Sequence, residues 1–89
     1  MPRFHFNVFD GTGLIDKEES ELATFAEARL EAIRRTGRTL LADPARIDRS
    51  NEWRMDVTDH TGLILLRLDF CMIETAATMA LNMRDAQSA

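Results

Sequence analysis

The stretch TFAEARLEAIRRTGRTLL, residues 24–41, decides the fold. Wound at about 3.6 residues per turn, it forms a helix with its apolar side chains on one side. That side consists of Phe25, Ala26, Leu30, Ile33, Gly37, Leu40 and Leu41. The other side carries Glu27, Glu31, Arg34, Arg35 and Arg38. We therefore predict one amphipathic helix, whose apolar face is needed by the strands on either side of it in the chain.

Both ends of this helix carry recognisable signals. Thr24 followed by Glu27 is the capping-box pattern of a helix start. Asp43-Pro44 supplies the stop, because a proline disfavours helical geometry at the residue before it.

A hairpin is expected before the helix. Residues 3–9 alternate between apolar and polar side chains, the period-two pattern of a half-buried strand. Residues 10–13, DGTG, form a turn, and Leu14 and Ile15 begin a short partner strand that ends near residue 17. The acidic run at residues 16–21 then leads into the helix.

A second hairpin is expected after the helix. Residues 42–51 are polar, contain Pro44, and serve as the connection. Residues 52–58 alternate as a strand, residues 59–62 form a turn, and residues 63–70 return. The first half of the returning strand is apolar on both sides, which suits a central strand or one covered on its second face by a partner.

The last segment, from Ile73 to about Arg84, carries an apolar stripe at helical spacing. This helix covers either the domain's own sheet or another subunit, and the pattern leaves both open. The expected order is ββαββα. It describes a two-layer α+β domain, a four-stranded antiparallel sheet packed on a central amphipathic helix with a second C-terminal helix. We place the domain at residues 1–85, with a frayed tail at 86–89.

Composition restricts the protein class. The chain has 89 residues, 45% of them hydrophobic and 29% charged, which is typical of one globular domain. A net charge of −4 argues against general affinity for nucleic acid or anionic membranes. A single cysteine excludes an intramolecular disulfide, and neither a signal-peptide pattern nor a membrane-spanning apolar run is present. We expect a cytoplasmic protein without membrane contact.

Several of these residues resemble a known pattern. The opening MPRFHFNVFDG, then Asp16, Glu19, Glu21-Leu22, Ala28-Arg29 and Glu31-Ala32, resembles a family of short alpha-proteobacterial proteins of unknown function. These proteins open M-P-R-[FY]-x-F-x-V-x-D-G, and their closing W-x-x-x-V-x-D-x-x-G hairpin is matched by Trp53, Val57, Asp59 and Gly62. Ser20 is a departure from the pattern, because proteins of this family tend to have glycine at that position. The resemblance covers about residues 1–70 and supports the order of elements, but it implies no activity.

The residues that could carry chemistry are few. His5 lies on a strand, His60 lies in a turn, and Cys71 follows an apolar strand. No H-x-x-x-H or C-x-x-C spacing supplies a metal site, and the DGTG turn matches neither a calcium loop nor a phosphate loop. We therefore predict no catalytic, metal-binding or cofactor-binding residues, and no enzyme.

Two surfaces remain as candidates for interaction. The first is for self-association through the returning strand at residues 63–70, the C-terminal helix, or both, with the candidate residues Leu63, Leu65, Met72, Met79 and Met83. The second is a basic patch for an acidic partner, formed by Arg34, Arg35 and Arg38. We expect a non-catalytic interaction module, a homo-oligomer with a dimer favoured, or one that binds an unidentified protein. The alternative is a nucleic-acid-associated or antitoxin-like regulator that uses the arginine face.

Overall fold

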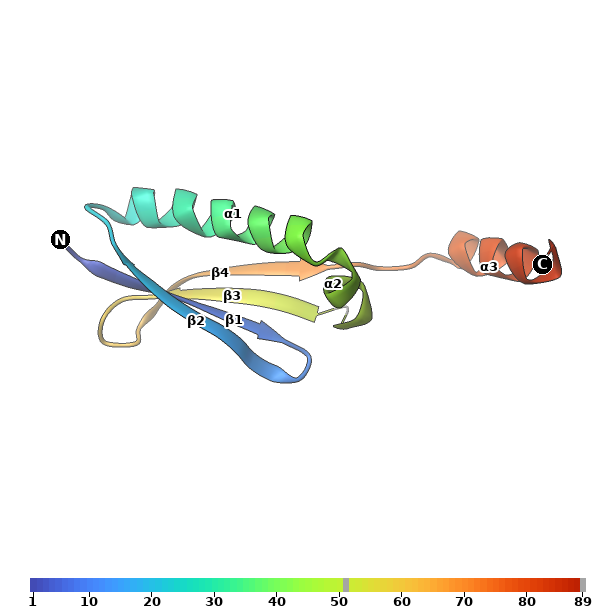
Figure 1. The fold of residues 1–89 in the computed structure, drawn as a ribbon, viewed down its shortest axis with the longest axis horizontal. Coiled ribbons are helices and arrows are strands. Elements are labelled where there is room, and N and C mark those ends of the chain that lie inside the picture. The colour runs from blue at the N-terminus through green and yellow to red at the C-terminus, as the bar shows by residue number, and fades with distance from the viewer. Residues whose placement is uncertain (51, 89) are drawn as a thin grey trace.

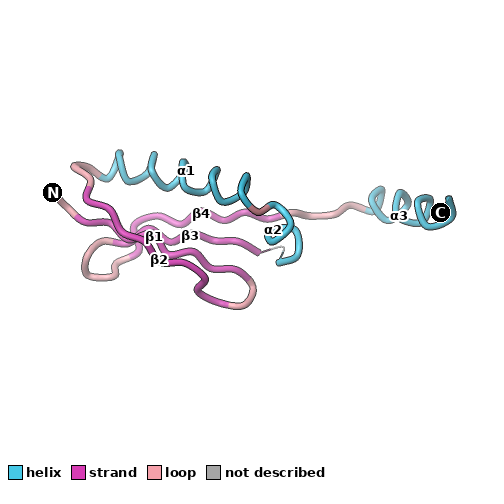
Figure 2. The backbone as a smooth tube through the Cα atoms, viewed as in Figure 1, coloured by secondary structure: helices cyan, strands magenta, loops and turns pink. Residues whose placement is uncertain are grey.

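The computed structural model describes the backbone of residues 1–50 and 52–88, and the side chains of residues 1–49 and 52–83. Within these residues, a four-stranded antiparallel sheet packs against a long helix (Figures 1 and 2), so the predicted two-layer α+β class is confirmed. The strand order is β2-β1-β3-β4. The elements are β1 (Arg3–Asp10), β2 (Gly13–Glu21), α1 (Phe25–Ala42), α2 (Pro44–Ser50), β3 (Glu52–Thr58), β4 (Ile64–Cys71) and α3 (Ala76–Ser88).

Both hairpins close with the same turn, Asp-x-Thr-Gly, at residues 10–13 and 59–62. In each turn the aspartate accepts a hydrogen bond from the threonine amide at 2.8 Å and another from the threonine hydroxyl. The threonine hydroxyl bond is the main cause that holds the pKa of both aspartates below its usual range. The glycine has a φ of 126° in the first turn and 92° in the second, a conformation strained for other residues.

The strand β2 is longer than predicted. The acidic run that the sequence analysis read as a lead-in to the helix pairs with β1, as far as Glu21 opposite Arg3. Backbone pairing at the edge of a sheet does not require apolar side chains, and charged side chains there stay in water. Arg3 bonds Glu21 at 2.9 Å and lies 3.6 Å from Glu19.

A short helix, α2, replaces part of the connection predicted at residues 42–51. Pro44 is its first residue, a position where proline is well tolerated because that amide has no partner in a helix. Asp43 accepts a hydrogen bond from the Arg46 amide at 3.2 Å, and its own amide donates to the Thr39 carbonyl. Ile47 is buried against the core. The proline that the prediction used to end one helix therefore also begins another.

The helix α1 begins where the capping box predicted. The Thr24 hydroxyl accepts a hydrogen bond from the Glu27 amide at 3.2 Å, and the Glu27 carboxylate accepts one from the Ala23 amide at 2.8 Å. These bonds satisfy amides that the first turn of a helix would otherwise leave without partners.

The face that α1 turns toward the sheet differs from the prediction. Ala28 and Ala32 are fully buried, whereas Leu30 and Ile33 are 58% and 55% exposed. Small helix residues allow the large side chains of the sheet to fill the space between the layers. The core consists of Phe4, Phe6, Val8, Ala28, Ala32, Ile47, Trp53, Met55 and Val57. The prediction that the leucine and isoleucine side of α1 covers the sheet was therefore wrong.

The polar residues on the inner side of α1 satisfy their own hydrogen bonds. The Thr36 hydroxyl donates to the Ala32 carbonyl at 2.8 Å, and the Thr39 hydroxyl donates to the Arg35 carbonyl at 3.0 Å. Because these bonds stay within the helix, both threonines can face the sheet without leaving a buried donor unpaired.

The C-terminal part of the chain leaves the body of the domain. The strand β4 is an edge strand, which excludes the alternative of a central strand, and the other alternative, a strand whose second face is covered by a partner, stays a prediction. The helix α3 starts at Ala76, three residues later than predicted, and projects beyond the sheet (Figure 1). The molecule is accordingly elongated, 59 × 22 × 21 Å. α3 reaches Ser88, and Ala89 lies outside the described residues.

The alanine contact gives a first prediction. Ala32→Leu adds three carbons to a fully buried site, and overpacking of this kind costs about 1–3 kcal/mol. We expect urea unfolding to show that loss. Ala45→Leu, the same change at an exposed position of α2, is the control and should change the free energy of unfolding by less than about 0.5 kcal/mol. Equal stability of the two variants would contradict the packing described.

Candidate interaction surfaces

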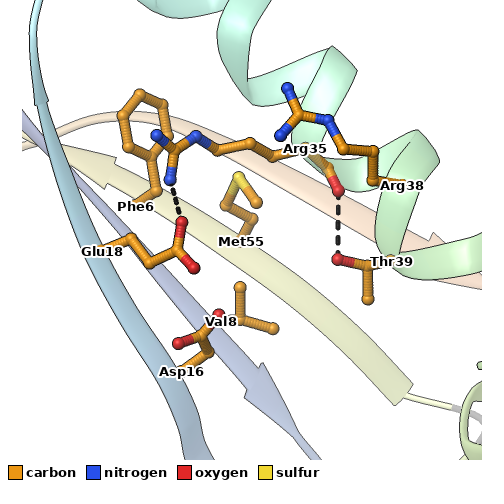
Figure 3. A pocket seen from close by; sticks show the side chains of 8 residues that line it. All are labelled: Phe6, Val8, Asp16, Glu18, Arg35, Arg38, Thr39 and Met55. Atoms are coloured by element: carbon orange, nitrogen blue, oxygen red, sulfur yellow. Dashed lines mark hydrogen bonds and ion pairs between the residues drawn. The ribbon is translucent and has the colours of Figure 1, made fainter. Parts of the chain in front are cut away.

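Arg35 is a structural side chain that joins α1 to the sheet. Its guanidinium lies 4.4 Å from the centre of the Phe6 ring, an arrangement that favours cation–π attraction. It pairs with Glu18, bonds Glu31 at 3.0 Å, and donates to the Ser20 hydroxyl at 2.8 Å. Figure 3 shows the guanidinium beside the Phe6 ring and directed at Glu18. Arg35 therefore does not belong to a solvent-facing patch. The prediction that it forms a basic patch with Arg34 and Arg38 was wrong for this residue.

The other two arginines of the predicted patch share one carboxylate. Glu31 lies 2.7 Å from Arg34, 3.0 Å from Arg35 and 3.5 Å from Arg38. Burial raises the pKa of Glu31, but the hydrogen bonds from Arg34 and Arg35 outweigh it and hold that pKa below its ordinary value of 4.5. The predicted patch thus reduces to Arg34 and Arg38, and their charge is partly neutralised.

A small cavity lies beside Arg35, between α1 and the first two strands (Figure 3). Its volume is about 170 Å³, below the ~300 Å³ at the lower end of ligand pockets. Its lining consists of Phe6, Val8, Asp16, Glu18, Arg35, Arg38, Thr39 and Met55. Two of its charged lining residues, Arg35 and Glu18, pair with each other.

The structure brings the two histidines together and separates them from the thiol. His5 and His60 line one cavity of about 310 Å³, together with Thr58. Cys71 is exposed and pairs with Glu52 across the ladder, six residues along β3 from Thr58, or about 20 Å. Among the described residues, no group of three or more histidines, cysteines and carboxylates could hold a metal ion.

The sheet face opposite α1 carries an ion pair that the sequence analysis did not find. Asp56 is only 4% exposed, although no helix among the described residues covers this face. Arg67 on β4 bonds both its oxygens, at 2.7 and 3.4 Å, and Arg54 lies 3.4 Å away. The hydrogen bond that Arg67 donates to Asp56 is the main cause that raises the pKa of Arg67. Alternation indicated charges here, but only the register puts Asp56 opposite Arg67.

The two edges of the sheet differ in chemistry. Along β2 the sequence from residue 16 to 21 is DKEESE, so charged side chains line that edge. The sequence of β4 is ILLRLDFC, which has two charges among apolar residues. Ile64 and Leu65 are 49% and 38% exposed, and Leu63 before them is 61% exposed. Charged edges discourage pairing with another strand, whereas an apolar edge invites it.

The five predicted self-association residues lie in separate places. Leu63 and Leu65 are exposed at the start of β4. Met72 is half-buried and shares a small cavity with Leu40 and Phe70. Met79 and Met83 are exposed on α3, which projects away from the sheet (Figure 2). The strand and the helix that the sequence offers for self-association therefore form two separate surfaces.

An apolar helix face, which we call the outer seam, is the feature that sequence analysis assigned to the wrong side. It consists of Ala26, Leu30, Ile33, Gly37 and Leu40. Leu40 reaches the core and lies near Phe70 of β4, whereas Arg35 on the opposite flank contacts β2. Apart from Leu40, the outer seam therefore faces away from the sheet, and it lies on the side of α1 nearer β4.

Comparison with known protein families gives one match. Residues 3–71 match the domain of unknown function DUF6894. The chain belongs to this family. The match confirms the resemblance to a family of uncharacterised proteins, and it ends with the last residue of β4, so α3 lies beyond the matched range. Comparisons with curated proteins and with solved structures find no match.

Among the described residues, no helix has the length and apolar character needed to span a membrane.

The environment of Glu31 gives a prediction about pH. The pKa of Glu31 is lower in the folded chain than in the unfolded chain, where it is 4.5. The Glu31 carboxylate therefore stabilises the fold fully at pH values above this unfolded pKa. This contribution is lost as the pH falls through the lower, folded pKa. We expect the stability difference between the wild type and Glu31→Gln to be constant near neutral pH and to shrink below pH ~4.5.

Urea unfolding at a series of pH values from 7 to 2.5 measures this difference. Glu74→Gln, at an exposed residue before α3, is the matched control and should track the wild type throughout. A stability difference between wild type and Glu31→Gln that persists unchanged to the lowest pH would contradict the assignment.

Proposed function

We propose that this protein is a small non-catalytic interaction domain that acts in the cytoplasm and self-associates, most simply as a dimer, through the edge strand β4. The observation that carries the proposal is the contrast between the two sheet edges: charged side chains line β2, and apolar ones line β4. A domain that avoided all strand pairing would protect both edges.

The edge of β4 has the groups that strand pairing needs. Every second backbone amide and carbonyl of an edge strand points away from its neighbour, ready to pair with another extended chain. Exposed Leu63, Ile64 and Leu65 add apolar area beside them. Full burial of a leucine or isoleucine side chain is worth about 1.5–3 kcal/mol. A second copy of β4 would supply both the backbone partners and the apolar cover.

Two features support a non-catalytic role. The residues best suited to nucleophilic or acid–base chemistry, Cys71 and the histidine pair, lie toward opposite ends of β3. In the cavity beside Arg35, the guanidinium of Arg35 is engaged in an ion pair with Glu18 that joins the helix to the sheet.

The helix α3 gives the proposed assembly a second possible contact. Met79 and Met83 are 66% and 64% exposed, and methionine adapts well to a partner's surface. By contrast, nothing in the described part of the chain favours a nucleic-acid-associated regulator, because Arg35 is occupied by the sheet and Arg34 and Arg38 share Glu31.

The edge contrast predicts the effect of a charge on each side of the sheet. The wild type should sediment at about twice the chain mass of 10.1 kDa. Leu65→Lys on β4 should raise the dimer dissociation constant at least about tenfold, since two lysines would meet near the axis of the pair. Leu14→Lys, at a 54% exposed leucine on β2, is the matched control and should remain a dimer.

Sedimentation equilibrium over a wide concentration range measures all three proteins. A monomeric wild type would refute self-association. Equal dissociation constants for Leu65→Lys and Leu14→Lys would refute the role of β4. If Met79→Glu separates the copies while Leu65→Lys does not, the contact belongs to α3 instead.

A further inference from the structure

We propose that α1 forms a second part of the self-contact, in which the α1 helices of two copies pack antiparallel along their outer seams. This inference rests on the proposed self-association and specifies which surface a second copy covers. Four observations carry it: the spacing of the seam, the glycine within it, the charges beside it, and its position relative to β4.

The spacing of the outer seam is that of helices that pair. From Ala26 the seam residues follow at intervals of four, three, four and three, ending at Leu40. This is the seven-residue repeat of a coiled-coil seam, extending over two heptads. Leu30 and Ile33 stay more than half exposed in the single chain. The domain itself uses Ala28 and Ala32 against its sheet, and of the seam only Leu40 packs against its core.

The glycine in the seam is unexplained within one chain. Gly37 lies in the interior of α1, where glycine is about 1 kcal/mol less favourable than alanine. A Cβ atom added there would meet no atom within 4 Å among the described residues, and the glycine has helical geometry rather than a positive φ. A neighbouring helix does explain it, because a residue without a side chain lets two backbones approach closely.

The charges beside the seam favour a second copy in the antiparallel sense. Glu27 and Arg34 flank the seam on the same side, two helical turns apart. In an antiparallel pair this flank meets its own counterpart, so Glu27 of each copy lies near Arg34 of the other. In a parallel pair Arg29 would instead lie near Arg34 of the second copy, and like charges would repel.

The position of the seam agrees with pairing through β4. Figure 1 shows α1 running along the length of the sheet. The seam lies on the side of α1 nearer β4, as the shared cavity of Leu40 and Phe70 shows. A two-fold axis perpendicular to the sheet at the β4 edge makes both the paired strands and the paired helices antiparallel. With this axis the paired strands and the paired helices therefore run in the same relative sense.

A double-mutant cycle on the dissociation constant tests the helix pair. Glu27→Arg and Arg34→Glu should each raise the constant about tenfold or more, because each creates two repulsive contacts per dimer. The double variant restores both contacts in reversed sense and should return to within about threefold of the wild type. Within one chain, Glu27 bonds the Ala23 amide and Arg34 bonds Glu31. If the two substitutions acted only by removing these contacts within one chain, their effects on the dissociation constant would add in the double variant and would not cancel.

The matched control changes Arg38 in place of Arg34. Arg38 also lies near Glu31 but is farther from the seam. Glu27→Arg combined with Arg38→Glu should not restore association. Ile33→Asp places a charge in the middle of the seam and should raise the dissociation constant at least about tenfold. Circular dichroism on each variant should show unchanged helix and strand content, which separates dissociation from unfolding.

The outcomes distinguish this inference from the proposed function. A dimeric wild type whose two single changes add without restoration, and which tolerates Ile33→Asp, would overturn the helix pair and leave pairing through β4 intact. A wild type that is monomeric at all concentrations would overturn both. If Met79→Glu and Met83→Glu abolish the dimer while the cycle is additive, α3 of the second copy covers the seam, and the helix pair is wrong.

Discussion

The close contact between two alanines of α1 and the sheet determines how the rest of the molecule is arranged. Ala28 and Ala32 are fully buried, and the aromatic and methionine side chains of β1 and β3 fill the layer beneath them. Once these alanines face inward, helical geometry puts Leu30 and Ile33 on the outside. The same rotation places Arg35 over Phe6 and beside β2. One packing contact thus produces both the charged connection to the sheet and the exposed seam.

The strands and caps could be predicted because their signals are local. Alternation gave β1, β3 and β4 to within about a residue, and the capping box gave the start of α1. The rotation of α1 could not be predicted in this way. Hydropathy counts Thr36 and Thr39 as polar, but their hydroxyls are satisfied by the helix's own carbonyls and can face the sheet. Arg35 likewise counts as a surface charge, although its guanidinium stacks on a core ring.

The sequence did not predict the helix α2, because one residue at its start has two roles. Asp43 ends α1 through its amide and begins α2 through its carboxylate, so a single stop signal concealed a second helix. Of the candidate surfaces, the exposure of Leu63 and Leu65 agrees with the two-sided apolar pattern of their strand. The Asp56–Arg67 pair depends on strand register, which alternation along one strand does not determine. The family match extends from β1 to β4 and so covers every strand described here.

The charges on β2 also limit how far this sheet can grow. A sheet with two open edges can add strands on both sides without end, which is how fibrils extend. Here residues 16–21 close one side with five charged side chains, so pairing at the opposite edge consumes the one apolar edge of each chain. In the assembly proposed above, association through β4 therefore stops at two copies. In that proposed assembly, the acidic run of β2 sets the number of copies from the side that does not touch the partner.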